Sequence, residues 1–273
     1  MKETWVGLVI RTAEYGETGK LLTLLTADGK RTVSVSGAKG IKSRFILLSQ
    51  LFSYGEYTVE NRNGRCYVSD VALIENFYEL FYDPLKLSLA SYACEVANQV
   101  CVENGAEEEM LSLLLNILYV LTAKAYSTEW IKAAFEARVV AIQGIAPSVE
   151  RCCRCGGDGG GMLYLDVMNG SSVCGDCLLA EEDAPARSEP IEEDGTARIL
   201  LPMEQAASRA LAYLLSCPPK KLFRYLVEER IAGTLSKLTE TYLQNHLECR
   251  TRSIAMYREL LAQAAFREEK GTL

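Results

Sequence analysis

The sequence predicts an α+β protein of several domains, in which a five-stranded N-terminal barrel is followed by an α-helical body with an inserted four-cysteine module. Apolar residues before residue 77 alternate with the period of two that strands require, whereas those beyond it recur with a helical period. Five of the ten cysteines fall between residues 152 and 177. We expect no export signal, and in a chain without one such a cluster indicates metal binding.

Residues 1–76 are expected to form the barrel. Five short runs have strand character, and they lie at residues 5–10, 21–26, 32–36, 57–59 and 66–68. Asp28-Gly29 and Asn63-Gly64 are hairpin turn pairs, because both central residues of a type I′ turn need positive φ. Five short strands joined by tight turns suit a small closed barrel, and the OB-fold is the architecture expected at this size.

Residues 77–149 and 201–273 are expected to form the helical body in two parts. One helix face is lined by residues three or four positions apart: Leu85, Leu89, Tyr92, Val96 and Val100. Residues 110–123 are apolar on almost every side, which predicts a central helix, and residues 129–143 predict a third. A further apolar stripe runs from Leu222 to Tyr242, and a last helix is expected from about Thr251.

The cysteine module is expected over residues 150–180. Cys152-x2-Cys155 and Cys174-x2-Cys177 are separated by 18 residues, a spacing typical of four-cysteine zinc sites. Four sulfur ligands leave no coordination position for water, so the sequence predicts one structural Zn²⁺ ion, with Cys153 outside the ligand set. Two redox-active C-x-x-C pairs are the alternative. They fit less well, because neither pair is predicted to open a helix after a strand.

The rest of the sequence limits the possible functions. Residues 181–200 begin with an acidic stretch that contains two prolines, and they are expected to form an exposed loop. The apolar stretch of residues 110–123 is shorter than the ~20 residues a membrane helix needs, and we expect a cytoplasmic protein without membrane contact. His246 is the only histidine, and no catalytic motif is complete, so we expect no enzyme.

A basic segment stands out in a chain whose net charge is −7. Between Gly29 and Gly55 there is no acidic residue, and the basic residues are Lys30, Arg31, Lys39, Lys42 and Arg44. We expect them to hold the phosphates of a DNA strand on one face of the barrel, with nearby aromatic rings available for base stacking. A solvated loop beside ordinary core aromatics stays open as the alternative.

Several motifs resemble one known family. IRTAEYGET (residues 10–18), KLLTLLT (20–26), GAKG (37–40) and KSRF (42–45) resemble the opening domain of the bacterial RecO family of DNA repair and recombination mediators. The resemblance continues through FEAR (135–138), GIAP (144–147), the four-cysteine module of zinc-bearing members, YLQNHL (242–247) and RTRS (250–253). It therefore covers most of the chain in the right order.

The resemblance implies an OB-fold, a helical body and a zinc module in a protein that binds single- and double-stranded DNA and anneals complementary strands. With RecR, such proteins help to load RecA, an indirect partner, onto strands coated by single-strand binding protein. The helical body of some members docks the C-terminal tail of that coating protein. For this tail we expect a groove near Lys132, Phe135 and Arg138, and for the protein a nucleoid-associated location.

Two other functions stay open. In the first, the chain is an adapter that recruits repair proteins through a zinc-stabilised scaffold and makes little direct contact with DNA. In the second, it is a zinc-containing nucleic-acid enzyme. The four-sulfur site and the lack of a catalytic constellation disfavour the enzyme.

Overall fold

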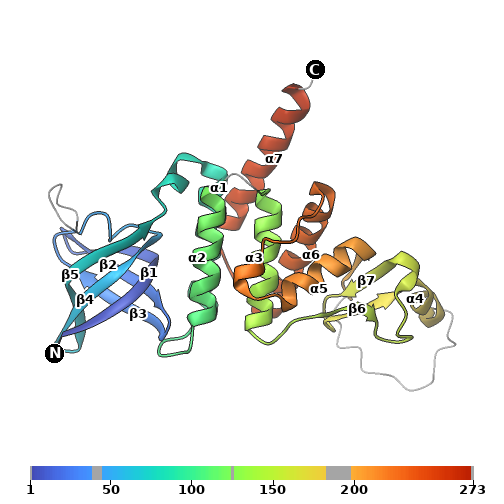
Figure 1. Cartoon of the computed structure of the whole chain (residues 1–273), viewed down its shortest axis with the longest axis horizontal. Helices are drawn as coiled ribbons and strands as arrows, with labels where there is room; N and C mark the ends of the chain where they lie inside the picture. Colours follow the sequence, from blue (N-terminus) through green and yellow to red (C-terminus); the bar gives the residue numbers. More distant parts are fainter. Residues whose placement is uncertain (1, 39–44, 124–125, 183–197, 272–273) are drawn as a thin grey trace. The chain divides into compact units, whose positions relative to one another are not determined.

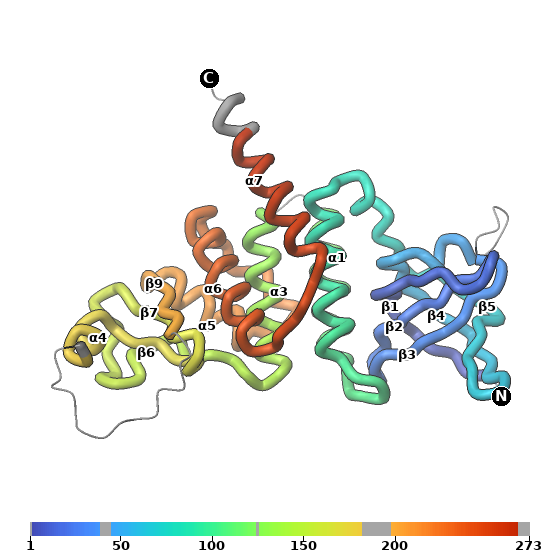
Figure 2. Tube along the Cα trace, turned by 180° about the vertical axis from the view of Figure 1, so that it is seen from behind, coloured from blue at the N-terminus to red at the C-terminus, as the bar shows by residue number. Residues whose placement is uncertain are grey.

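The computed structural model describes residues 2–38, 45–123, 126–182 and 198–271. The chain separates into two compact units, residues 1–128 with 249–273 and residues 129–248 (Figures 1 and 2). The first unit holds β1 (Lys2–Tyr15), β2 (Gly19–Thr26), β3 (Gly29–Val35), β4 (Ser53–Arg62), β5 (Arg65–Asn76), the 3-10 helix η1 (Tyr78–Tyr82), α1 (Pro84–Val100), α2 (Glu108–Thr122) and α7 (Ser253–Gly271). The second holds α3 (Thr128–Ile142), β6 (Ser148–Cys152), η2 (Gly159–Gly161), β7 (Met162–Asp166), β8 (Ser171–Cys174), α4 (Gly175–Glu182), β9 (Leu200–Glu204), α5 (Gln205–Ser216), η3 (Pro219–Lys221) and α6 (Glu229–Leu247).

The five strands of the first unit form a closed barrel in the order β1-β2-β3-β5-β4, which confirms the predicted OB-fold (Figure 1). Closure depends on the length of β1. Its first half pairs with β4, starting with Lys2 opposite Glu60, and its second half pairs with β2, ending with Tyr15 opposite Gly19. Aliphatic side chains fill the interior around Tyr57, whose hydroxyl donates to a backbone carbonyl oxygen at 2.9 Å.

The two predicted hairpin turns differ in conformation. Asn63 and Gly64, between β4 and β5, both have positive φ, at 52° and 77°, as a type I′ turn requires. Between β2 and β3 only Gly29 does, with φ of 107°. The backbone that joins α1 to α2 passes so close to this turn that a Cβ on Gly29 would lie 2.6 Å from the amide nitrogen of Asn104. The β2–β3 turn therefore packs the barrel against the segment that joins α1 to α2 in the same unit.

The helices of the first unit come from both ends of the chain. Asp83 caps α1 by accepting from the backbone N–H groups of Leu85 and Lys86 at 3.1 and 3.2 Å. Near the other end of α1, the side chains of Glu95 and Gln99 accept from the backbone N–H groups just before α7. These contacts fix the start of α7 beside α1, where both views show it (Figures 1 and 2).

The central helix of the second unit is α3, in which every residue from Trp130 to Val140 is buried. The helix predicted to be central, residues 110–123, is α2 of the first unit, and it keeps an exposed side on which Tyr119 is 67% accessible. Ser112, Asn116 and Tyr119 are spaced four and three positions apart, so they follow one stripe of this helix. The overall apolar character of the segment concealed that stripe.

A small four-stranded sheet, in the order β6-β8-β7-β9, carries the cysteine module. Sequence reasoning missed it because its strands are only four or five residues long. Helix α5 packs against the sheet, and the Ser208 hydroxyl donates to the Val149 carbonyl oxygen of β6 at 2.7 Å. Helix α6 begins at Glu229, so the predicted apolar stripe from Leu222 to Tyr242 is only partly helical.

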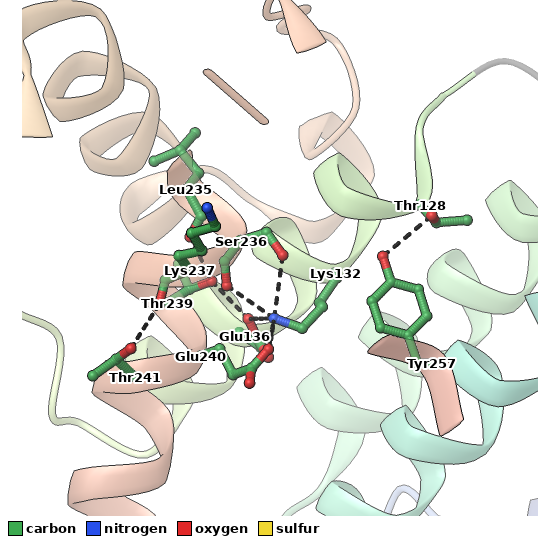
Figure 3. Close-up of polar contacts among 10 residues, drawn as sticks. All are labelled: Thr128, Lys132, Glu136, Leu235, Ser236, Lys237, Thr239, Glu240, Thr241 and Tyr257. Atoms are coloured by element: carbon green, nitrogen blue, oxygen red, sulfur yellow. Dashed lines mark hydrogen bonds and ion pairs between the residues drawn. The ribbon is translucent and has the colours of Figure 1, made fainter. Parts of the chain in front are cut away.

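A buried ion cluster joins α3 to α6 (Figure 3). The Lys132 Nζ atom lies 2.9 Å from a carboxylate oxygen of Glu136 and 2.6 Å from one of Glu240, and it donates to the Ser236 carbonyl oxygen at 2.9 Å. The Thr239 hydroxyl donates to Glu136 at 2.6 Å. The Lys132 and Glu136 side chains are 1% and 0% exposed, so each depends on its partners to offset the loss of water.

We expect Lys132→Ala to lower the free energy of unfolding by about 3–5 kcal/mol, because it leaves the Glu136 carboxylate buried without its cation. Urea denaturation followed by circular dichroism measures the change. The control is Lys237→Ala on the exposed side of α6, the helix that α3 contacts through the cluster, and it should stay within about 0.5 kcal/mol of the wild type. Equal losses in the two variants would contradict the role of the cluster.

Candidate metal site and nucleic-acid interface

The four predicted metal ligands converge at one edge of the small sheet. Cys152 is the last residue of β6, and Cys155 lies in the turn that follows. Cys174 ends β8, and Cys177 lies in the first turn of α4. Because β6 and β8 are parallel neighbours, both turns leave the sheet at the same edge.

The distances between the sulfur atoms fit a tetrahedral metal ion. All four sulfurs lie within 4.8 Å of one another, and the Sγ atoms of Cys155 and Cys174 are 3.7 Å apart. Tetrahedral ligands about 2.3 Å from an ion would be about 3.8 Å apart. In the part of the chain that the structure describes, no other group of His, Cys, Asp or Glu converges in this way. The cluster can therefore bind a metal ion.

The backbone around the first turn favours a thiolate at Cys152. Desolvation opposes ionisation there, but N–H groups of Cys155, Cys174 and Arg154 point at the sulfur and lower the pKa of Cys152 to about 6. The Cys177 thiol instead shares hydrogen bonds with the sulfurs of Cys174 and Cys155, which raise its pKa to about 12. A thiolate at Cys152 close to the protonated thiol of Cys177 is a site in which a cation would displace a proton.

Contacts within the protein also hold the two turns together. The Arg154 guanidinium donates to the Cys177 carbonyl oxygen at 3.3 Å and pairs with Glu181 on α4. Cys153 is exposed, and its backbone N–H donates to the Ser172 carbonyl oxygen on β8 at 2.8 Å. The structure therefore keeps Cys153 apart from the four converging sulfurs.

The prediction that neither C-x-x-C pair opens a helix after a strand is wrong for the second pair. β8 runs directly into α4, and Cys174-x2-Cys177 spans that junction. The module differs from two independent redox pairs because the two pairs converge on each other. The Sγ atoms of Cys155 and Cys174, which come from opposite turns, are close enough to share a metal ion.

Two of the five predicted DNA-binding residues are placed by the structure, and they do not converge. Lys30 and Arg31 are successive residues of β3, so their side chains point to opposite faces of the strand. Lys30 Nζ donates to the Asn98 carbonyl oxygen in the last turns of α1 at 2.5 Å. The Arg31 guanidinium lies 4.7 Å from the centre of the Trp5 ring. The other three, Lys39, Lys42 and Arg44, lie outside the described residues.

The hairpin between β4 and β5 brings cations and tyrosines together that sequence reasoning missed. Arg65 donates to the Tyr15 hydroxyl at 2.7 Å, and the Arg62 guanidinium lies 6.0 Å from the centre of the Tyr67 ring. Arg62 also pairs with Glu60. β3 pairs with β5 through Ser34 and Tyr67, so the end of β3 lies close to this hairpin. The sequence signal was the pair of arginines on either side of Asn63-Gly64.

A cationic hollow of about 520 Å³ also lies within the first unit, between β1 and the backbone that precedes α7. Arg11, Arg250 and Arg252 line it. Glu95 also lines it, but this carboxylate is already bonded to backbone N–H groups. Among the described residues, none of the three arginines forms an ion pair with a side chain, so their charges are available to an anionic ligand.

The residues predicted to bind a protein tail are buried. Lys132 belongs to the ion cluster of Figure 3, Phe135 is 0% exposed, and Arg138 is 7% exposed and donates to the Leu215 carbonyl oxygen. A partner could not reach them in this fold, so they do not form the expected groove. Burial was not visible in the sequence, because charged residues on a helix usually face solvent.

In the part of the chain that the structure describes, we found no helix that combines the length and the apolar character needed to span a membrane.

A closed OB barrel in one unit and a four-cysteine cluster in the other define an OB-fold protein with a four-sulfur site that can bind a metal ion. The family model "Recombination protein O N terminal" matches residues 1–77, and "Recombination protein O C terminal" matches residues 82–191. The chain therefore belongs to the RecO family, and its role lies in DNA repair and recombination.

Individual relatives agree with this assignment. The DNA repair protein RecO of Acetivibrio thermocellus is 28% identical over 243 residues, which cover 89% of this chain and 90% of the relative. The protein of the same name from Clostridium novyi is 29% identical over 171 residues, 62% of this chain and 67% of the relative. That from Symbiobacterium thermophilum is 29% identical over 183 residues, 65% of this chain and 72% of the relative.

We expect Cys174→Ser to lose most of the bound metal, because removing one of four sulfurs breaks the tetrahedral set. Elemental analysis of the purified protein gives the metal content per chain. Cys153→Ser is the matched control, since it removes an exposed thiol next to the site, and it should keep the wild-type content. Retention of metal by the first variant, or its loss from the second, would reassign the ligands.

Proposed function

We propose that this protein binds single-stranded DNA through its barrel, anneals complementary strands and, with RecR, helps to load RecA onto strands coated by single-strand binding protein. It acts without catalytic turnover. The observation that carries the proposal is that a closed OB barrel, in a family of DNA repair proteins, bears Arg11, Arg31 and Arg65, none of which forms an ion pair among the described residues. Because the net charge of the chain is −7, these unpaired cations are a local feature of the barrel rather than a general property of the protein surface.

Strand binding would combine two kinds of contact. Arg11, Arg250 and Arg252 face a hollow beside the barrel, and the segment that contains Lys39, Lys42 and Arg44 adds further charge. Arg65 and the tyrosines of the β4–β5 hairpin can supply a phosphate contact and stacking surfaces. Such contacts do not read sequence, and they suit a protein that must act on any damaged strand. Two strands held by these charges would repel each other less, which favours annealing.

The metal site would stabilise the second unit. We infer that the ion is Zn²⁺, because four thiolates in a tetrahedral arrangement are its usual structural set. Cys152, Cys155, Cys174 and Cys177 would hold it, and no ligand position would stay open for a substrate. Its contribution is therefore to folding rather than to chemistry on DNA.

Protein partners need a surface other than the buried residues of α3. Five large apolar side chains at the end of β5 and in η1 are between 42% and 80% exposed: Leu73, Ile74, Tyr78, Phe81 and Tyr82. The Tyr78 and Tyr82 rings are in contact, with centres 6.1 Å apart. Exposed apolar groups at this density are typical of protein interaction sites, and we assign this surface, the β5–η1 patch, to a protein partner of the repair pathway. The second candidate function is that of an adapter that recruits repair proteins without contacting DNA directly. The β5–η1 patch favours this function.

Reversing the charge of Lys39, Lys42 and Arg44 together should remove most of the affinity for a labelled oligothymidine at low salt. The slope of log affinity against log salt should become shallower by about 0.7 for each phosphate that the variant no longer binds. Fluorescence anisotropy at several salt concentrations measures both quantities.

Lys30→Ala is the comparison for this experiment, because its ammonium group is bonded to the end of α1. It should lower thermal stability and leave the salt slope unchanged. Unchanged affinity in the triple variant, together with intact partner binding, would favour the adapter instead.

Ile74→Glu with Tyr82→Glu should abolish partner binding and leave annealing of bare strands intact, because both side chains project from the surface of the β5–η1 patch. Co-purification with RecR and with single-strand binding protein tests the first expectation, and oligonucleotide annealing the second. Glu substitutions at the exposed residues Tyr119 and Leu226 provide a control of equal charge. Partner binding by the patch variant at the wild-type level would exclude this surface.

A further inference from the structure

The described lysines and arginines of the second unit, apart from the buried Arg138, fall into two groups. In the first group each residue has a partner: Arg154 and Arg198 pair with Glu181, Arg230 pairs with Glu204, and Lys132 lies in the buried ion cluster. In the second group no ion pair forms among the described residues, and its members are Arg151, Arg209, Lys220, Lys221, Arg224 and Lys237. All of this group except Lys237 belong to one stretch of surface.

A groove of about 750 Å³ forms the centre of that surface. One wall is formed by Arg151 at the end of β6 and by the Gly156-Gly157 backbone beyond it, and the other is formed by α5, with Arg209 and Tyr213. β6 and α5 lie side by side in Figure 2 and are joined by the Ser208 hydrogen bond. The groove lies beside the first cysteine turn, so the metal site and the groove share a wall.

The groove continues onto the segment between α5 and α6. The Tyr213 hydroxyl donates to the Lys221 carbonyl oxygen, and the Tyr213 ring lies against that of Tyr225, with centres 5.3 Å apart. The backbone N–H group of Arg224 donates to the same Lys221 carbonyl oxygen at 3.0 Å, so Arg224 lies close to Tyr213. Tyr225 is 39% exposed and follows Arg224 directly in the chain, so an exposed aromatic side chain adjoins these cations.

Acidic groups offset only part of this charge. Glu150 and Asp158 line the groove together with Arg151 and Arg209. Asp158 accepts from the Gly160 N–H group at 3.3 Å, and together with Glu150 it contributes two negative charges to the groove. Beyond the groove, Lys220, Lys221 and Arg224 add three positive charges that no acidic side chain among the described residues pairs with. The net charge of this surface is therefore positive, although most other cations of the unit are held in ion pairs.

We propose that this surface, the α5–η3 face, binds a single strand of nucleic acid. Phosphates contact Arg209, Lys220, Lys221 and Arg224, and a base stacks on Tyr225. An aromatic face among cations in an open groove is the arrangement by which proteins bind single strands without reading sequence, whereas a docked acidic protein segment would need no stacking face. The inference extends the proposed function, because it gives the protein a strand site in the second unit that is separate from the barrel.

The affinity test uses Arg209→Glu with Arg224→Glu, because Arg209 lines the groove and Arg224 shares the Lys221 carbonyl oxygen with Tyr213. The control, Lys86→Glu with Lys237→Glu, changes the net charge equally at sites away from the groove. The probe is a labelled oligothymidine of about 30 nucleotides, longer than the site of one barrel. At about 50 mM salt the first variant should bind on the order of fiftyfold more weakly than the control, and its salt slope should be shallower by about 1.4.

The direct test is photo-crosslinking of the same oligonucleotide, substituted with 4-thiothymidine, followed by mass spectrometry of the peptides. Crosslinks to residues 205–226 in the wild type, reduced in Tyr225→Ala, would support the site. If the wild type binds the strand but crosslinks only in the first unit, and the two double variants bind alike, the inference fails and the proposed function stands. If the wild type does not bind the strand at all, the proposed function itself fails. If Arg209→Glu with Arg224→Glu weakens binding of a polyglutamate peptide but leaves strand binding intact, the inference is overturned in favour of an acidic protein partner.

Discussion

The second unit depends on the convergence of four cysteine sulfurs at one edge of a very small sheet. Its strands are four or five residues long, which is too short for backbone pairing alone to hold them. The parallel pairing of β6 and β8 brings the two cysteine turns to the same edge, and a shared ion would fix them there. One wall of the adjoining groove is formed by Arg151 at the end of β6 and by the paired glycines that follow the first of these turns. The shape of that groove therefore follows from the geometry of the sulfurs.

The positive surfaces of this protein are determined by which cations lack an acidic partner, not by the total number of basic residues. Acidic residues outnumber basic ones by 36 to 29, and many of the cations are used inside the fold. Lys132 holds two helices together, Arg154 joins the cysteine turns, and Lys30 bonds to the end of α1. Cations that have no acidic partner among the described residues gather on the hollow beside β1 and on the α5–η3 face. An acidic chain can thus present local positive surfaces without becoming basic overall.

The sequence was most informative where local chemistry determines structure. Alternation and the Asn63-Gly64 turn were sufficient for the barrel, and cysteine spacing was sufficient for the cluster. It was least informative where tertiary packing decides. Lys132 and Arg138 have the composition of a helix surface, yet they are buried, because Glu136, Glu240 and a backbone carbonyl from α5 offset their charge. The cationic hollow beside β1 joins Arg11 to Arg250 and Arg252 across most of the chain, and no local pattern could have indicated it.

The return of α7 to α1 has a consequence for biosynthesis. The first unit contains residues 1–128 and 249–273, so the second unit is an insertion within it. A ribosome delivers every residue of the inserted unit before it delivers the last helix of the unit made first. The cysteine module is therefore complete on the nascent chain before the start of α7 can reach its anchors, Glu95 and Gln99. The barrel-bearing unit can be completed only after the inserted unit has been synthesised.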